Sequence, residues 1–111
     1  MEAAKKLTRG NRADVQPLLE EVVRVVCRHV GGKGLRMYLF GSWAQNRATS
    51  VSDLDVALDT GKPIGPAVMQ KIADALDELP TLRKTDLVDL QAVGQEFRKR
   101  VLQHGELVYG H

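Results

Sequence analysis

The sequence is poor in cysteine, in aromatic side chains and in long apolar segments. Cys27 is the single cysteine among 111 residues, so an intrachain disulfide is excluded and a buried thiol in a reducing cytoplasm is expected. No apolar run approaches the roughly 20 residues that cross a bilayer, and residues 1–12 lack the apolar segment of a secretory signal. We therefore expect a cytoplasmic protein without a membrane partner.

The chain also lacks a large excess of either charge. Sixteen Lys and Arg residues stand against fourteen Asp and Glu residues, and the net charge of +2 is spread along the whole length. Tight sequence-independent binding to nucleic acid needs a concentrated basic surface, so a nucleic-acid partner is not expected. With 43% hydrophobic content the chain can bury one core, which predicts a single domain over 1–111 with a loosely ordered lead-in over 1–12.

Apolar residues at helical spacing predict three helices. The first covers 14–30, with Asp14 as its N-cap and two glycines at its end. The second begins at Pro66 and ends at Pro80, and the third covers 95–103. Residues 43–48 are expected to form a short helical turn.

Short apolar or alternating segments between these helices predict strands over 35–40, 51–58 and 82–90. The terminal GELVYG suits a short edge strand. Helices and strands in this order predict an α+β (mixed α/β) fold in which a small mixed β-sheet has helices packed on one face.

The strand predicted over 51–58 carries two acidic residues on one face. Asp53 and Asp55 alternate with apolar residues, so they lie roughly 7 Å apart on the same side of the strand. Two such residues can simply decorate an exposed edge. However, aspartate is disfavoured in strands, and the two like charges repel each other unless a cation lies between them. A divalent metal ion would resolve that conflict.

A third carboxylate occurs in the next predicted strand, LRKTDLVDL. Asp86 and Asp89 fall on opposite faces by the period of two, so at most one of them can join the first pair. Asp86 is preferred because it lies in mid-strand, whereas Asp89 is near the strand end and is expected to cap or to face solvent. Carboxylates from two neighbouring strands can hold two Mg²⁺ ions roughly 4 Å apart, as in phosphoryl-group displacement.

Gly41 and Ser42 end the first predicted strand. A Gly-Ser pair is common in turns and at helix starts, so alone it is more often structural than functional. Beside an acidic strand it has a second interpretation, because glycine lets the backbone approach a phosphate and free amides of the turn can donate to its oxygens. Gly41 and Ser42 are therefore candidate nucleotide-binding residues.

In these features the chain resembles the polymerase-beta-like nucleotidyltransferases, and within them the minimal nucleotidyltransferase group. The resemblance is carried by Gly41-Ser42, then ten residues, then Asp53-Leu54-Asp55, and by Asp86 between hydrophobic residues. It implies that all three acids are catalytic metal ligands for two Mg²⁺ ions and that Asp86 helps to activate the acceptor hydroxyl. The Gly-Ser turn would then hold the triphosphate of ATP.

Two positions depart from the family pattern. Members of the group often have Arg directly after the Gly-Ser pair and Gly three residues later, where this chain has Trp43 and Asn46. Asn tolerates left-handed backbone, so the turn can persist. Arg47 is a candidate to replace the missing arginine in nucleotide binding, and Arg47→Ala is expected to raise the apparent nucleotide dissociation constant. Trp43 is expected to pack rather than to stack on a base.

The resemblance further implies a partner. Proteins of this group are commonly the antitoxins of small helical HEPN toxins, and some transfer AMP onto a tyrosine of the toxin. The valine-rich helix 14–30 is apolar over a wide arc, which indicates either deep burial or a homo- or hetero-oligomer contact. Two alternatives stay open: a catalytically silent, binding-only antitoxin, and a transferase acting on a small molecule or an RNA end.

Overall fold

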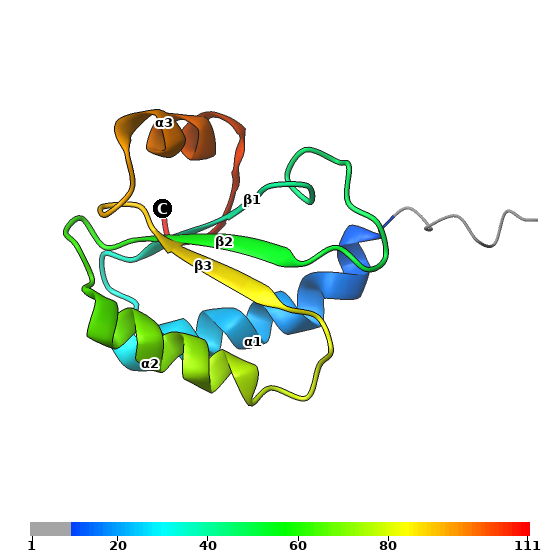
Figure 1. Ribbon diagram of the computed structural model, residues 1–111, viewed down its shortest axis with the longest axis horizontal. Coiled ribbons are helices and arrows are strands. Elements are labelled where there is room, and N and C mark those ends of the chain that lie inside the picture. Colours follow the sequence, from blue (N-terminus) through cyan, green and yellow to red (C-terminus); the bar gives the residue numbers. More distant parts are fainter. Residues whose placement is uncertain (1–9) are drawn as a thin grey trace, which may run out of the picture.

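The computed structural model describes residues 10–111, and these form the expected mixed α+β fold (Figure 1). The first nine residues of the predicted lead-in lie outside this described part. In chain order the elements are α1 (Arg12–Val30), β1 (Arg36–Phe40), β2 (Leu54–Asp59), α2 (Pro66–Asp77), β3 (Thr85–Asp89), α3 (Gln95–His104) and β4 (Glu106–Tyr109).

The strands form one sheet in the order β3-β2-β1-β4. β1 is antiparallel to both β2 and β4, whereas β2 and β3 are parallel, so the sheet is mixed as predicted. A parallel pair needs a long crossover connection, which α2 provides between β2 and β3. β4 lies at an edge, which was also expected.

The helices occupy both faces of the sheet. α1 and α2 lie side by side beneath it, and α3 lies on the opposite side (Figure 1). The expectation of a single helical face holds for α1 and α2 only. α3 has its own small cluster, in which Val101 and Phe97 pack with Ala57 of β2 and Phe40 of β1. The rings of Phe40 and Phe97 meet edge to face, with their centroids 5.6 Å apart.

The main core lies between the sheet and the pair α1 and α2. On β2, Leu54, Val56 and Leu58 are fully buried in this core, as their alternation predicts. Ala57 faces the other way and is also fully buried, because α3 covers it. The face of β2 that carries Asp55 is therefore covered at one end and not at the other.

The wide apolar arc of α1 is used mostly inside the chain. Its buried residues are Val15, Leu19, Val22, Val25 and Val26. Val23 and Cys27 are half-buried and, together with Tyr109, line an open groove of about 460 Å³. The thiol of Cys27 is thus less buried than expected. Contact of α1 with another chain stays a prediction.

Several predicted boundaries were wrong by a few residues. α1 begins at Arg12 because the side chain of Asn11 accepts a hydrogen bond from the backbone N–H of Ala13 at 3.0 Å. Asp14, the expected N-cap, lies within the first turn. The segments before β2 and β3, which were expected to be strand, are loops and turns.

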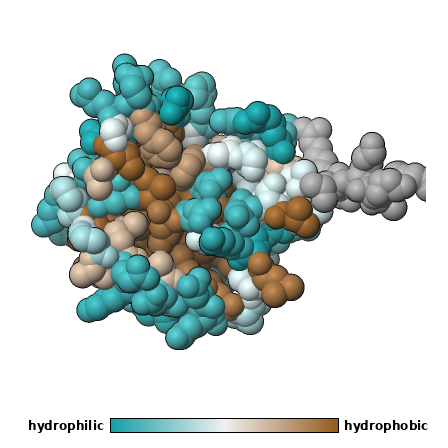
Figure 2. Space-filling view, viewed as in Figure 1, coloured by the Kyte–Doolittle hydropathy of each residue, from teal (hydrophilic) through white to brown (hydrophobic). Residues whose placement is uncertain are grey.

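The outer surface follows the same layers. Figure 2 shows apolar residues gathered across the middle of the visible face, while hydrophilic residues cover the outer sides of α3 and α2. Within residues 10–111, no helix combines the length and apolar character required to cross a bilayer.

Candidate active site

The predicted acidic residues gather where β2 and β3 begin. Asp55 of β2 stands directly opposite Asp86 of β3 in the parallel register, and Asp53 comes just before β2. Asp55 is also paired with Phe40 of β1, which belongs to the cluster under α3. The acids therefore lie on the α3 side of the sheet, at the end that α3 leaves open.

The electrostatics of Asp55 reflect this grouping. Its burial, followed by the charges of Asp86 and Asp53, raises the pKa of Asp55 above the ordinary aspartate value. Asp55 is half-buried, while Asp53 and Asp86 are exposed. The three carboxylates thus repel one another, and Asp55 has the least access to water that would relieve this repulsion.

Gly41 brings the predicted phosphate-binding turn against Asp55. Its φ of +73° is in the left-handed region that favours glycine. A Cβ on Gly41 would lie 3.0 Å from Cγ of Asp55 and closer still to Oδ2, so a larger residue would displace this carboxylate. Glycine is required here both by the backbone conformation and by the contact with the carboxylate.

Residues 41–46 form a compact turn, which overlaps the short helical turn predicted over 43–48. The backbone N–H of Arg47 donates to the carbonyl of Ser42 at 2.8 Å, and that of Gln45 donates to the carbonyl of Gly41 at 3.1 Å. Asn46 has a φ of +59°, so the expected tolerance of asparagine for left-handed backbone is used. The turn persists without the family's glycine.

The side chain of Arg47 lies on the turn itself. It is exposed, and its guanidinium donates to Oε1 of Gln45. The structure thus places Arg47 a few residues from Gly41 and Ser42, and its predicted role in nucleotide binding stays a prediction.

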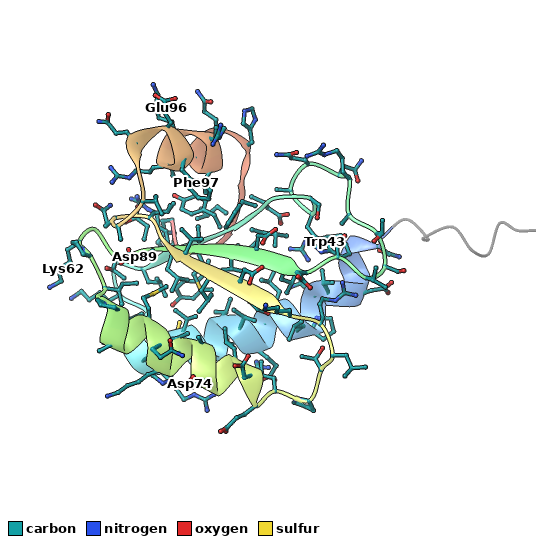
Figure 3. All side chains as sticks on the ribbon, viewed as in Figure 1. Trp43, Lys62, Asp74, Asp89, Glu96 and Phe97 are labelled. Carbon is teal, nitrogen blue, oxygen red and sulfur yellow. The ribbon has the colours of Figure 1, made fainter. Side chains whose placement is uncertain are left out.

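Trp43 packs, as expected, instead of lying free for stacking. It is only 8% exposed and belongs to the main core. Its indole N–H donates to the carbonyl of Ser52 at 3.4 Å, so the residue ties the turn to the loop before Asp53. In Figure 3 Trp43 lies near the start of α1, away from α3.

Arg83 is a site residue that sequence reasoning missed. Its guanidinium donates to the carbonyl of Ser52 and, at 2.8 Å, to that of Ser50. It also lies 5.4 Å from the centre of the Trp43 ring. Arg83 therefore fixes the loop that leads into Asp53 to the segment that leads into β3. An arginine three positions after Pro80 gives no sequence signal for this role.

Asp89 is structural, as its position near the strand end suggested. It is 7% exposed and accepts hydrogen bonds from the backbone N–H groups of Ile64, at 2.8 Å, and Gln91, at 3.0 Å. Asp89 pairs with Leu58, on the α1 and α2 side of the sheet. The choice of Asp86 over Asp89 for the acidic group agrees with this register.

The acidic group supplies donors of the type that Mg²⁺ prefers. Asp53, Asp55 and Asp86 offer carboxylate oxygens, which are hard ligands. Among residues 10–111, no three His, Cys, Asp or Glu side chains stand close enough to form a ready-made metal cage. Mg²⁺ does not require one, because it commonly binds one or two carboxylates and completes its shell with water and substrate phosphates.

Comparison with known families agrees with this arrangement. The family described as "Polymerase beta, Nucleotidyltransferase" matches residues 33–111, which include the Gly41 turn and both acidic strands. The chain belongs to this nucleotidyltransferase family, and the resemblance inferred from its motifs is confirmed.

Individual relatives point in the same direction. The chain is 28% identical over 71 residues to a Methanocaldococcus jannaschii protein assigned by name as a protein adenylyltransferase. The matched region covers 64% of this chain and 70% of that protein. A chain in a crystal structure of a toxin–antitoxin with AMP-PNP matches with a TM-score of 0.62 and 26% identity, over 83% of this chain and 73% of that one.

A further match shows the fold alone. It is a chain from the complex of a tri-AMPylated Shewanella oneidensis HEPN toxin with an MNT antitoxin. The TM-score is 0.60 at 24% identity, and the match covers 86% of this chain and 72% of that one.

Proposed function

We propose that this protein is a metal-dependent nucleotidyltransferase that moves AMP from ATP onto a HEPN-type helical partner protein, as the antitoxin of a toxin–antitoxin pair. One observation carries the proposal most directly: Gly41 leaves no room for a side chain because Asp55 lies against it, and Asp86 lies opposite Asp55. A glycine turn and an acidic pair are thereby held together by three adjacent strands.

Magnesium fits the acidic group by its donor chemistry. Asp53, Asp55 and Asp86 would hold the metal. Burial, followed by the charges of Asp86 and Asp53, raises the pKa of Asp55, and a divalent cation would relieve the part that comes from these charges. When bound, Mg²⁺ would neutralise charge that develops on the phosphate oxygens during transfer. We propose two ions, as the resemblance implies.

The chain's own groups would position the substrates. The backbone of Gly41 and Ser42 and the guanidinium of Arg47 would bind the triphosphate, because they offer N–H donors on one turn. Asp86 is exposed on the far side of Asp55 from Gly41, where it can accept the proton of an acceptor hydroxyl. Attack on the α-phosphate then releases pyrophosphate in line.

The nature of the acceptor is supported by the relatives. One relative is assigned by name as a protein adenylyltransferase, and one solved neighbour, at 26% identity, comes from a toxin–antitoxin with AMP-PNP. A protein acceptor is favoured over a small molecule or an RNA end for this reason. The net charge of only +2 further disfavours long RNA.

A binding-only antitoxin is the second candidate, and the Trp43 position favours it. In this chain a buried tryptophan stands where family members often have an arginine after the Gly-Ser pair, and the loss of that arginine would weaken phosphate binding unless Arg47 replaces it. A protein that neutralises its partner by contact alone would still neutralise it after the carboxylates of the acidic group are removed. The variant Asp53→Ala/Asp55→Ala, used below, separates the two functions.

The test measures transfer of the label from α-labelled ATP, in the presence of Mg²⁺, onto a co-expressed neighbouring protein. Wild type is compared with Asp53→Ala/Asp55→Ala, and with Asp74→Ala as a control, since Asp74 is exposed on α2. Label is expected on the partner with wild type and Asp74→Ala, and not with the double variant or with excess chelator. Transfer that persists in chelator would break the mechanism. Partner binding without label from any variant would favour the contact-only function.

A further inference from the structure

A small pocket adjoins the candidate active site on the α3 side of the sheet. It has a volume of about 180 Å³ and lies between the Gly41 turn and α3. Its lining includes Phe40, Gly41 and Ala44 on one side and Phe97, Arg100 and His104 on the other. Gly41 therefore belongs both to the pocket and to the contact with Asp55.

The helix presents one consistent face to this pocket. Positions 97, 100, 101 and 104 of α3 recur at the three- and four-residue spacing of a single helix face. Figure 3 shows Phe97 directed from α3 towards the sheet, whereas the neighbouring Glu96 is directed away from it. The floor is thus aromatic and aliphatic, and Arg100 and His104, both exposed, supply polar groups at the rim.

This chemistry suits a flat ring with a polar edge. An aromatic floor disfavours a phosphate, because burying an anion against apolar groups is costly. A volume of about 180 Å³ is also smaller than the pockets that enclose whole drug-sized ligands, so it matches a part of a nucleotide. Stacking on aromatic side chains binds any nucleobase.

The position of the pocket favours the nucleotide over the acceptor as its ligand. The pocket is lined by Phe40 at the end of β1 and by Gly41, which follows it, whereas Asp86 lies on β3, on the other side of β2. In an in-line displacement the acceptor and the leaving group occupy opposite sides of the reacting phosphate. With the acceptor on the Asp86 side, the leaving pyrophosphate points towards the Gly41 turn. The pocket adjoins this turn and has an apolar floor, so among the parts of the nucleotide it suits the base that is bonded through the ribose to the same α-phosphate.

We propose that this pocket between the Gly41 turn and α3 is the nucleobase subsite of the enzyme, with Phe97 and Phe40 as its apolar floor and Arg100 at its rim. The proposal rests on the proposed nucleotidyltransferase function and adds the residues that hold the base.

The test compares two ligands by calorimetry in the presence of Mg²⁺: ATP, and tripolyphosphate, which has no base. Wild type is expected to bind ATP about tenfold more tightly than tripolyphosphate. Ala44→Phe fills the pocket and should remove this difference while leaving tripolyphosphate binding unchanged. Arg100→Ala should weaken ATP binding more than tripolyphosphate binding. Lys99→Ala is the matched control, because Lys99 is an exposed cation of α3 that does not line the pocket.

Each contrary result has a distinct meaning. Equal binding of both ligands by wild type, or equal weakening of both in Ala44→Phe, would overturn the base subsite and leave the transferase function intact. Unchanged ATP affinity in Ala44→Phe with loss of transfer would also overturn it and assign the pocket to the acceptor. If wild type binds neither ligand with Mg²⁺, the proposed function fails and the subsite fails with it.

Discussion

At the scale of single residues, the candidate site depends on one close contact between backbone and carboxylate. Gly41 follows β1 directly and has a positive φ, and Asp55 of the adjacent strand fills the space that a side chain would need. The same contact holds Asp55 partly away from water. Position and ionisation of Asp55 are therefore linked through Gly41.

Gly41→Ala is expected to abolish transfer. The new Cβ would displace the carboxylate of Asp55, in addition to a left-handed backbone strain of about 1–2 kcal/mol. Gly61→Ala is the matched control, since Gly61 has a similar φ of +85° but no atom within 4 Å of a Cβ. Both variants should lose stability in thermal melts through the backbone strain that they share. Only the first should lose transfer, and equal activity of the two would contradict the contact's importance.

Asp55→Asn is expected to stabilise the metal-free protein at neutral pH while removing activity. The pKa of folded Asp55 is raised, so between the ordinary aspartate pKa and this raised value the folded state binds more protons than the unfolded state. Stability therefore falls as the pH rises through that window, and above it the ionised group is destabilising. The neutral amide avoids this cost, which the partial exposure of Asp55 to solvent keeps small.

Urea unfolding in chelator, at neutral pH and below the ordinary aspartate pKa, measures this effect. The stability gain should be present at neutral pH and vanish at acidic pH. Asp74→Asn supplies the control. Asp74 is exposed on α2 and accepts a hydrogen bond from the side chain of Gln70 at 2.8 Å. A gain of Asp55→Asn that persists at acidic pH would point to a cause other than charge.

At the scale of secondary structure, two loops carry the site, and a packed pair of side chains joins them. Trp43 and Arg83 both donate to the carbonyl of Ser52, one residue before Asp53. Arg83 itself lies two residues before β3, which carries Asp86. The start of β2 and the start of β3 are thus fixed relative to each other by side chains as well as by strand pairing.

Arg83→Ala is expected to lower the transfer rate by about 10- to 100-fold, because small displacements of reacting groups have effects of this size. The fold should persist, since the main core does not include Arg83. Arg24→Ala is the control, because Arg24 is exposed on α1 and pairs only with Glu21 in the ion pairs seen. Transfer rates measured across a Mg²⁺ titration, with circular dichroism for folding, provide the comparison. An unchanged rate and Mg²⁺ requirement would exclude a positioning role.

The spacing of apolar residues predicted the helices and strands better than it predicted how these elements pack on one another. Alternation along β2 correctly placed Leu54, Val56 and Leu58 in the core, because successive side chains of a strand point to opposite faces of the sheet. The face chosen by α3 was not predictable in this way. Its one apolar stripe could pack on either side of the sheet, and the partners that fix it, Phe40 and Ala57, are distant in sequence.

The candidate site was predictable to a similar degree. The motif placed Gly41, Asp55 and Asp86 together, and the strand register agrees with that grouping. Arg83 was missed because its function lies in contacts to main-chain carbonyls, which any loop can offer. The pocket beside α3 was missed because it exists only once α3 lies on that face.

At the scale of the whole molecule, the two faces of the sheet have different roles. α1 and α2 cover one face and bury the main core. α3 covers only part of the other, so that Asp53 and Asp86 stay exposed and Asp55 half-exposed beside it. Most of the stabilising burial is thus separate from the acidic end, where like charges oppose folding.

This separation predicts how ligands act on the stability of the entire fold. Mg²⁺ with a non-hydrolysable ATP analogue should raise the melting temperature, because the ligand binds only the folded state and neutralises the repulsion around Asp55. At a hundred times the dissociation constant the gain is about 2.7 kcal/mol, which corresponds to roughly 10 °C or more for a domain of this size. Asp53→Ala/Asp55→Ala should melt higher than wild type without ligand and should gain little from it. A ligand-induced rise of equal size in both proteins would place nucleotide binding away from the acidic strands, because the double variant keeps the fold and lacks only the carboxylates that this site requires.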